Sequence, residues 1–227
     1  HMTGSAAVHD AIVWGAPDVR EANRAANAPV LTKEITSELG CVTPVVLVPG
    51  EWTKRELAFQ ARNVATQVVN NASFNCNAAK VLVTAAGWPQ REAFLAELRS
   101  VLGRAPSRLP YYPGSEERYA RFEECAPNSE RLGAPSDGHL PWLLATDLDP
   151  EDPDAHAFRN EAWCGVLAET SLTADDPGDF LAHATEFCNE TLFGTLSMSL
   201  VIDPRTRRSH STAYEAALRD LRYGSVV

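Results

Sequence analysis

The chain has 227 residues, of which 44% are hydrophobic, so it can bury the core of a single sizeable domain. Its formal net charge of −10, with no cluster of Lys or Arg, would repel a phosphate backbone, so we expect no nucleic-acid partner. No apolar run approaches the roughly 18 residues that a membrane helix needs, and the N-terminus lacks the features of a signal peptide. We therefore expect a cytoplasmic protein with no membrane partner.

The cysteines form an odd set without CxxC spacing, which predicts free thiols rather than disulfides or a zinc site: Cys41, Cys76, Cys125, Cys164 and Cys188. The histidines form no recognisable Cys-His arrangement, which argues against a triad of the cysteine-protease kind. The acidic run 147–154 contains prolines and no Gly-centred ligand ladder, so we interpret it as a solvated loop rather than a Ca²⁺ site. No metal is predicted.

The first half of the chain alternates strand and helix. Residues 44–49 form a short β-branched run bounded by prolines, which is typical of a strand buried on both faces. Thr53 and Glu56 make a capping box before a helix with apolar residues at helical spacing. A second strand over 80–84 precedes a helix that we expect to be opened by Pro89 and ended by Gly103.

The second half continues this alternation after an excursion from the sheet over 105–137, which contains one short helix around 115–124. The remaining predicted elements are strands over 142–146, 165–168 and 196–202, helices from about Asp179 and Thr212, and a strand that begins at Val226. This order predicts an α/β fold with a mostly parallel sheet covered by helices.

Two segments carry residues suited to catalysis. Cys76 lies in the loop Asn71–Ala78, between a helix and a strand, where a thiolate could attack a carbonyl. Glu38 lies in a mostly uncharged setting before a turn glycine and a buried strand, a position suited to a general base. Either segment alone is weak evidence, because most such residues are a small buried hydrophobe or an exposed carboxylate.

Together, Glu38-Leu39-Gly40, the strand and helix that follow, and the spacing Asn71-x-x-x-x-Cys76 resemble the NAD(P)-dependent aldehyde dehydrogenase superfamily. Thr3-Gly4-Ser5 resembles the turn that ends the family's cofactor domain, a match that favours a native His1-Met2 over a cloning scar. Glu161-Ala162-Trp163-Cys164-Gly165 resembles its Glu-x-Phe-Gly-Pro segment, and Tyr223–Val227 resembles the strand before its oligomerisation segment. The resemblance covers the whole chain.

The resemblance implies oxidation of a small-molecule aldehyde to a carboxylic acid, with NAD or NADP as cofactor. Cys76 would form a thiohemiacetal and then a thioester, and Glu38 would activate the hydrolytic water. Gly4, Ser5, Glu161 and Trp163 would contact the cofactor, with Glu161 on the nicotinamide ribose.

The sequence also departs from the family pattern. Cys41 replaces the second glycine of Glu-Leu-Gly-Gly, Ser73-Phe74 replaces Gly-Gln before the nucleophile, and Cys164-Gly165 replaces Gly-Pro. Lys80, the basic residue that opens the next strand, comes one residue early. These changes affect the expected substrate pocket and cofactor preference more than the chemistry.

The resemblance divides the chain into residues 1–34, the tail of a cofactor-binding domain and its connection, and residues 35–227, a catalytic domain without the oligomerisation segment. We expect a fragment that is inactive alone and belongs to a homo-oligomer when full length. Two alternatives remain open: a non-catalytic remnant that serves as an interaction module, and a cysteine-dependent ester or thioester hydrolase that needs Cys76 and Glu38 but no nicotinamide.

Overall fold

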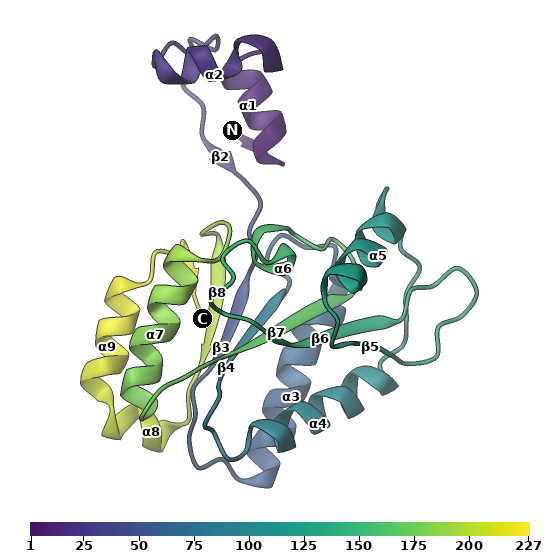
Figure 1. The fold of residues 1–227 in the computed structure, drawn as a ribbon, viewed down its shortest axis with the longest axis vertical. Coiled ribbons are helices and arrows are strands. Elements are labelled where there is room, and N and C mark those ends of the chain that lie inside the picture. Colours follow the sequence, from purple (N-terminus) through teal and green to yellow (C-terminus); the bar gives the residue numbers. More distant parts are fainter.

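Short β-branched and apolar runs form a seven-stranded sheet in the computed structural model, which describes residues 1–227 (Figure 1). Its order is β5-β6-β7-β4-β3-β8-β9, and every pair is parallel except β5 with β6. The strands are β3 (Pro44–Leu47), β4 (Val81–Ala85), β5 (Ser129–Leu132), β6 (Trp142–Leu148), β7 (Val166–Leu172), β8 (Ser197–Val201) and β9 (Ser225–Val226). The predicted α/β fold with a mostly parallel sheet is confirmed.

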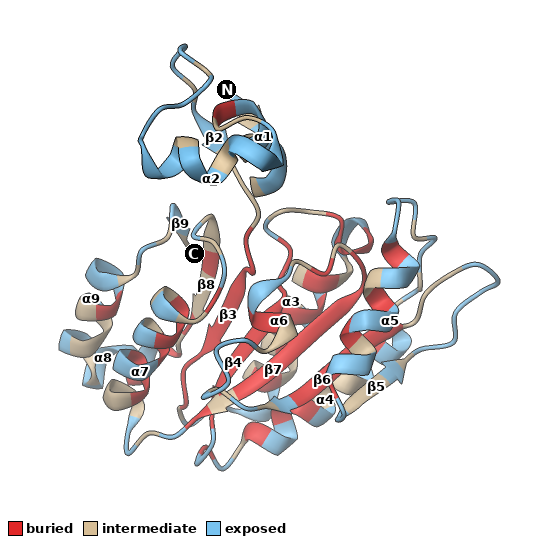
Figure 2. Ribbon diagram, turned by 45° about the horizontal axis from the view of Figure 1, so that its top comes forward, coloured by how far each residue is buried: buried red, intermediate tan, exposed pale blue.

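Helices cover both faces of this sheet, as the strand order requires. The connection from β3 to β4 and the connection from β7 to β8 run in opposite directions across the sheet. Because connections between parallel strands are right-handed, the helices of these two connections lie on opposite faces. One face carries α3 (Lys54–Val69) packed against α4 (Arg91–Arg104), and the other carries α7 (Pro177–Glu190) packed against α9 (Ser211–Asp220) (Figure 1). The central strands are therefore buried on both sides (Figure 2).

The predicted capping box is present: the Thr53 side chain accepts from the backbone N–H of Glu56, and the Glu56 carboxylate accepts from the backbone N–H of Thr53. The two predicted ends of α4 were wrong. Pro89 lies in a tight turn after β4, and the helix begins at Arg91. Gly103 is inside the helix, whose last carbonyls accept from the backbone N–H of Ala105.

The predicted excursion over 105–137 is also partly wrong. It contains α5 (Ser115–Cys125), as expected, but residues 129–132 return to the sheet as the antiparallel edge strand β5. An antiparallel neighbour needs no helical crossover, so the alternation of strand and helix did not reveal it. The short helices α6 (His156–Arg159) and α8 (Pro204–Ser209) were not predicted either.

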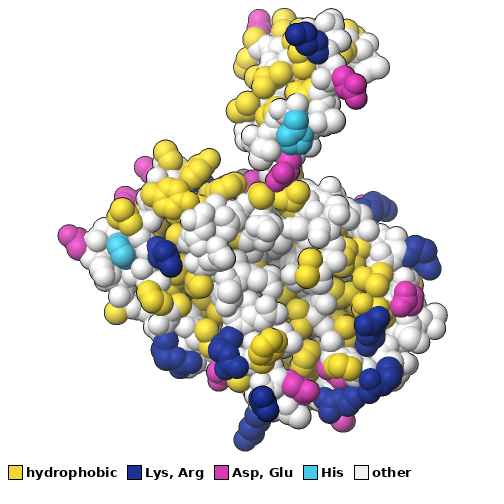
Figure 3. Space-filling model, turned by 180° about the vertical axis from the view of Figure 1, so that it is seen from behind, with side chains coloured by type: hydrophobic (Ala, Val, Ile, Leu, Met, Phe, Trp, Pro, Cys, Tyr) yellow, Lys and Arg dark blue, Asp and Glu magenta, His cyan; other side chains and the backbone are white.

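A small N-terminal body stands apart from the sheet (Figure 1). It contains α1 (Ala6–Val13), α2 (Pro17–Ala25) and a two-stranded parallel sheet of β1 (Met2–Thr3) and β2 (Ser37–Glu38). Most of it is exposed (Figure 2), and hydrophobic side chains lie on its surface, including Val8, Ile12, Val19 and Val30 (Figure 3). Because β2 follows residue 34, this small sheet crosses the boundary that we expected between the two parts of the chain.

The hydrophobic core lies between the sheet and its helices, and no helix is both long and apolar enough to cross a bilayer. Phe94 of α4 is fully buried and contacts Trp88, with 6.2 Å between ring centroids.

Replacing this buried ring should therefore destabilise the whole α/β body. We expect Phe94→Ala to lower the free energy of unfolding by about 3–5 kcal/mol in urea denaturation. Phe59→Ala is the matched control, because Phe59 is 57% exposed on α3, and it should change the free energy by no more than about 0.5 kcal/mol. Equal losses in the two variants would contradict the position of the core.

Candidate active site

The predicted site residues gather at the amino-terminal edge of the parallel sheet. Residues 40–43 lead into β3, residues 76–80 lead into β4, and residues 161–165 lead into β7. Since β3, β4 and β7 run in one direction, these three segments meet at the same edge, which faces the N-terminal body (Figure 1).

The loop that carries Cys76 has an unusual backbone. Asn71, Ala72 and Ser73 follow α3 with φ values of 50°, 54° and 68°, a left-handed region that costs free energy for residues other than glycine. Ser73 occupies the position where the family pattern has glycine, which adopts such angles without strain. The Asn71 side chain supports the turn by donating to the carbonyl of Phe74 at 3.2 Å.

The carboxylate of Glu38 is close enough to Cys76 to affect the pKa of the thiol. The thiol of Cys76 is half-buried, and its pKa is raised first by burial and then by the nearby Glu38 carboxylate. The backbone N–H of Asn77 and the charge of Lys80 lower the pKa of the thiol, but by less. A carboxylate close to a cysteine is placed to accept a proton from a water molecule that attacks a thioester on that sulfur.

The N-terminal turn is held beside Glu38 by backbone hydrogen bonds. Thr3 lies opposite Glu38 in the two-stranded sheet, and the N–H of Gly4 donates to the carbonyl of Glu38 at 3.0 Å. Ser5 caps α1 by accepting from the N–H of Val8 at 3.2 Å. Both predicted cofactor residues of this turn, Gly4 and Ser5, are therefore placed next to the predicted base.

Lys80 lies beneath the Cys76 loop and is 4% exposed. Its ammonium group donates to the carbonyls of Asn75 at 3.3 Å, Cys76 at 3.0 Å and Ala78 at 3.0 Å. The sequence marked Lys80 only as the residue that opens the strand. Its contacts with the loop depend on the tertiary fold, and no local pattern indicated them.

Glu161 is the charged partner of Lys80, with 4.0 Å between Oε1 and Nζ. The Glu161 Oε1 atom is buried and accepts no hydrogen bond within the chain. The other oxygen, Oε2, lies against Gly40: a Cβ atom on Gly40 would be only 2.1 Å from it. The glycine of Glu38-Leu39-Gly40 thus leaves the space that the Glu161 carboxylate occupies.

Aromatic side chains join the Cys76 loop to the Glu161 segment. Tyr112, from the excursion, stacks on Trp163 with 5.1 Å between ring centroids and on Phe74 with 5.8 Å. Arg118 donates to the carbonyls of Ala162 at 3.0 Å and Trp163 at 3.2 Å. Trp163 is half-buried and lies with Glu161 at the same edge, while the roles of Tyr112 and Arg118 were not predicted.

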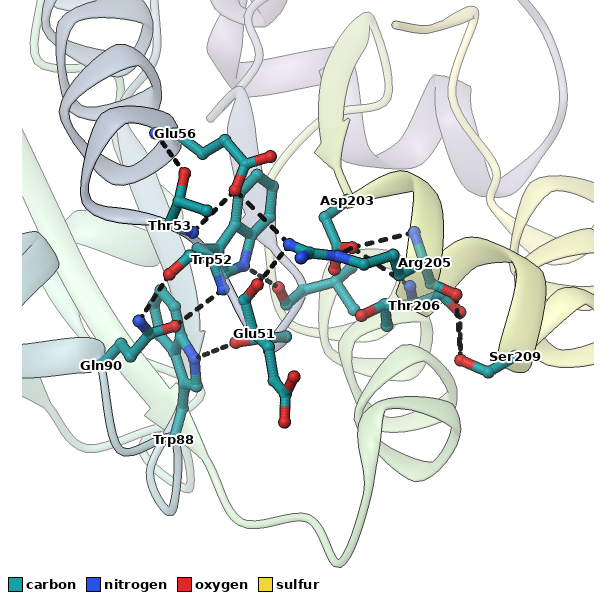
Figure 4. Close-up of polar contacts among 12 residues, drawn as sticks. Glu51, Trp52, Thr53, Glu56, Trp88, Gln90, Asp203, Arg205, Thr206 and Ser209 are labelled. Carbon is teal, nitrogen blue, oxygen red and sulfur yellow. Dashed lines mark hydrogen bonds and ion pairs between the residues drawn. The ribbon is translucent and has the colours of Figure 1, made fainter.

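The opposite, carboxyl-terminal edge holds a polar network rather than a second candidate site (Figure 4). Trp52 and Gln90 exchange hydrogen bonds at 3.0 and 2.7 Å, and Trp88 donates to the carbonyl of Gly50 at 3.0 Å. Arg205 of α8 reaches Asp203 and Glu56 at 3.2 and 3.4 Å (Figure 4). These groups bind one another and fasten α8 to the start of α3.

Within residues 1–227, no three His, Cys, Asp or Glu side chains cluster in a way that could hold a metal ion, including those in the acidic run 147–154.

The contact between Gly40 and Glu161 gives a direct test of this geometry. Gly40→Ala should lower the free energy of unfolding by roughly 1–3 kcal/mol, because the new methyl group has to displace a half-buried, ion-paired carboxylate. Gly87→Ala is the control: a Cβ there meets nothing within 4 Å. Chemical denaturation of both variants measures the difference, and an undiminished stability of Gly40→Ala would show that Glu161 does not pack where the structure has it.

Comparison with known proteins gives a clear result at the level of fold. No family model and no curated protein sequence matches the chain. Among solved structures it is similar to 1-pyrroline-5-carboxylate dehydrogenase from Thermus with bound NAD, at 17% identity and a TM-score of 0.71. It is also similar to lactaldehyde dehydrogenase from Escherichia coli (16%, 0.68) and to gamma-glutamyl-gamma-aminobutyraldehyde dehydrogenase from Burkholderia cenocepacia (18%, 0.66).

Each comparison covers 99% of this chain but only 41%, 44% and 42% of those three proteins, respectively. The chain therefore spans less than half the length of the dehydrogenases that it matches. At these identities the likeness is one of fold, and it extends over nearly the whole chain. The chain has the fold of the corresponding part of aldehyde dehydrogenases.

Proposed function

We propose that this chain carries the catalytic centre of an NAD- or NADP-dependent aldehyde dehydrogenase, with Cys76 as nucleophile and Glu38 as general base. The observation that supports this most is that the Glu38 carboxylate is close enough to raise the pKa of the Cys76 thiol, at the edge of a sheet with the dehydrogenase fold. In domain terms, residues 1–34 belong with the cofactor-binding part and residues 35–227 form the catalytic part.

The residues at this edge fit a nicotinamide cofactor. The buried Oε1 atom of Glu161 lacks a hydrogen-bond donor, and a ribose hydroxyl would supply one. Gly4, Ser5 and Trp163 would contribute further contacts to the cofactor. One of the solved dehydrogenases with this fold has NAD bound. When bound, the cofactor supplies a hydride acceptor.

In the first half-reaction the Cys76 thiol loses its proton to solvent and the sulfur attacks the aldehyde carbon, which forms a C–S bond and turns the carbonyl oxygen into an oxyanion. The backbone N–H of Cys76 donates no hydrogen bond to another backbone group, so it is free to stabilise that oxyanion. A single donor of this kind contributes roughly 2.7–4 kcal/mol to transition-state stabilisation. With a hydride acceptor held by Glu161 and the residues around it, loss of hydride from the thiohemiacetal would leave a thioester on Cys76.

In the second half-reaction Glu38 accepts a proton from water while the water oxygen attacks the thioester carbon. The C–S bond breaks, the carboxylic acid leaves, and Cys76 is restored. The position of Glu38 in β2, tied to β1 by the hydrogen bond to the Gly4 N–H, fixes its backbone for this task. The half-buried setting of Glu38 limits access of bulk water to the carboxylate.

The reactivity of the thiols tests the assignment of the nucleophile. Burial raises the pKa of Cys164 to about 12 and raises that of Cys188 further, and Cys41 is fully buried, whereas Cys125 is exposed at the end of α5. In a Cys125→Ser background, brief substoichiometric iodoacetamide should label Cys76 before the other three, as read by peptide mass spectrometry. Preferential labelling of Cys41 or Cys164 would refute the assignment of Cys76 as the nucleophile.

The proposed base can be tested in protein expressed from its complete coding sequence. Glu38→Gln should leave hydride transfer intact but slow hydrolysis, so the thioester accumulates and NADH appears as a burst followed by slow turnover. Cys76→Ser is the comparison, since it should abolish the burst itself. Steady turnover at the unmodified rate in Glu38→Gln would refute the role of base.

A further inference from the structure

The buried ammonium group of Lys80 supports the loop of residues 71–78, which contains Cys76 and is called the nucleophile loop below. Its three hydrogen bonds go to backbone carbonyls of Asn75, Cys76 and Ala78, so all three N–H donors of the ammonium act on the same short loop. The loop begins with three left-handed residues, which persist only where surrounding contacts hold them. Lys80 supplies three of the hydrogen bonds that hold the rest of this loop.

Holding the loop does not by itself require a positive charge. The hydroxyl of Thr43 donates to the same Cys76 carbonyl at 3.2 Å and is neutral. Burying an ammonium group costs free energy, and its one carboxylate partner, Glu161, is 4.0 Å away and makes no hydrogen bond to it. This buried cation is 3.0 Å from the carbonyl of Cys76, so its charge acts on the residue that carries the thiol.

We propose that Lys80 is a positioning residue for Cys76: its ammonium both fixes the nucleophile loop and stabilises the thiolate, and Glu161 holds that ammonium in its charged form. This inference rests on the proposed role of Cys76 as nucleophile. Lys80 does not touch the reacting carbonyl and acts through the loop and through its charge.

The charged groups around the two side chains determine the direction of the effect. Two charged groups act on the thiol: Glu38 raises the pKa of Cys76, and Lys80 lowers it. Burial lowers the pKa of Lys80, and the negative charges of Glu161, Cys41 and Cys76 oppose this. Without Lys80, burial and Glu38 both raise the pKa of the thiol, while only the Asn77 N–H still lowers it.

The experiment follows the pH dependence of Cys76 alkylation by iodoacetamide, measured by mass spectrometry, in the Cys125→Ser background. Lys80→Met removes donors and charge, and Lys80→Gln keeps two donors without the charge. Thr43→Val removes a neutral donor to the same carbonyl, and Lys54→Met removes an exposed lysine. Circular dichroism and thermal melting report whether each variant folds.

We expect both Lys80 variants to raise the midpoint of alkylation, which is the pH at which Cys76 alkylation reaches half of its maximal rate. They should also slow the reaction of Cys76 roughly 3- to 10-fold at neutral pH, because less thiolate is present. Thr43→Val and Lys54→Met should leave the midpoint unchanged. An unchanged midpoint in a folded Lys80→Gln protein would overturn the proposal, and failure of both Lys80 variants to fold would count against it by making Lys80 structural.

The outcomes separate this inference from the proposed function. If Cys76 is not the most reactive thiol in the Cys125→Ser background, the proposed function fails. If Cys76 is the most reactive thiol but its midpoint does not move in the Lys80 variants, only the positioning role fails.

Discussion

The site depends on one buried cation. Lys80 connects segments that are distant in the sequence: its ammonium holds the loop of Cys76, and its ion pair with Glu161 brings in the segment before β7. Glu161 in turn lies against Gly40, whose missing side chain gives the carboxylate its space. Because an unpaired buried charge is strongly destabilising, each of these groups constrains the others, and the amino-terminal edge forms one unit.

The order of the strands explains why these segments meet. β3 and β4 are neighbours, β7 lies beside β4, and all three run the same way, so the loops that precede them are adjacent at one edge. The N-terminal turn reaches this edge through a separate route, the short pairing of β1 with β2. The two-stranded sheet thereby places Gly4 one residue and Ser5 two residues beyond Thr3, the partner of Glu38, although most of the N-terminal body stands clear of the large sheet.

The sequence was most informative where burial is continuous. Strands such as β3 and β4 are covered on both faces, so they appear as apolar runs, and the capping box at Thr53 is a local pattern that needs no tertiary partner. The edge strand β5 has polar and charged residues and lies among Pro and Gly, so nothing local distinguished it from a loop. Cys76 and Glu38 were proposed as site residues through the resemblance of their segments to aldehyde dehydrogenases. The contacts of Lys80 depend on residues that only the folded chain brings together.

The position of the candidate site at the amino-terminal edge of the sheet has an electrostatic consequence. In a parallel sheet with helical crossovers, the amino ends of strands lie beside the carboxyl ends of the preceding helices, and α3 ends at Val69 just before the nucleophile loop. A helix carries its negative pole at that end, so the macrodipole opposes a thiolate instead of stabilising it. The end of this helix therefore offers no stabilisation to a negative charge at this edge, and the cation that lowers the pKa of the Cys76 thiol is the Lys80 side chain instead.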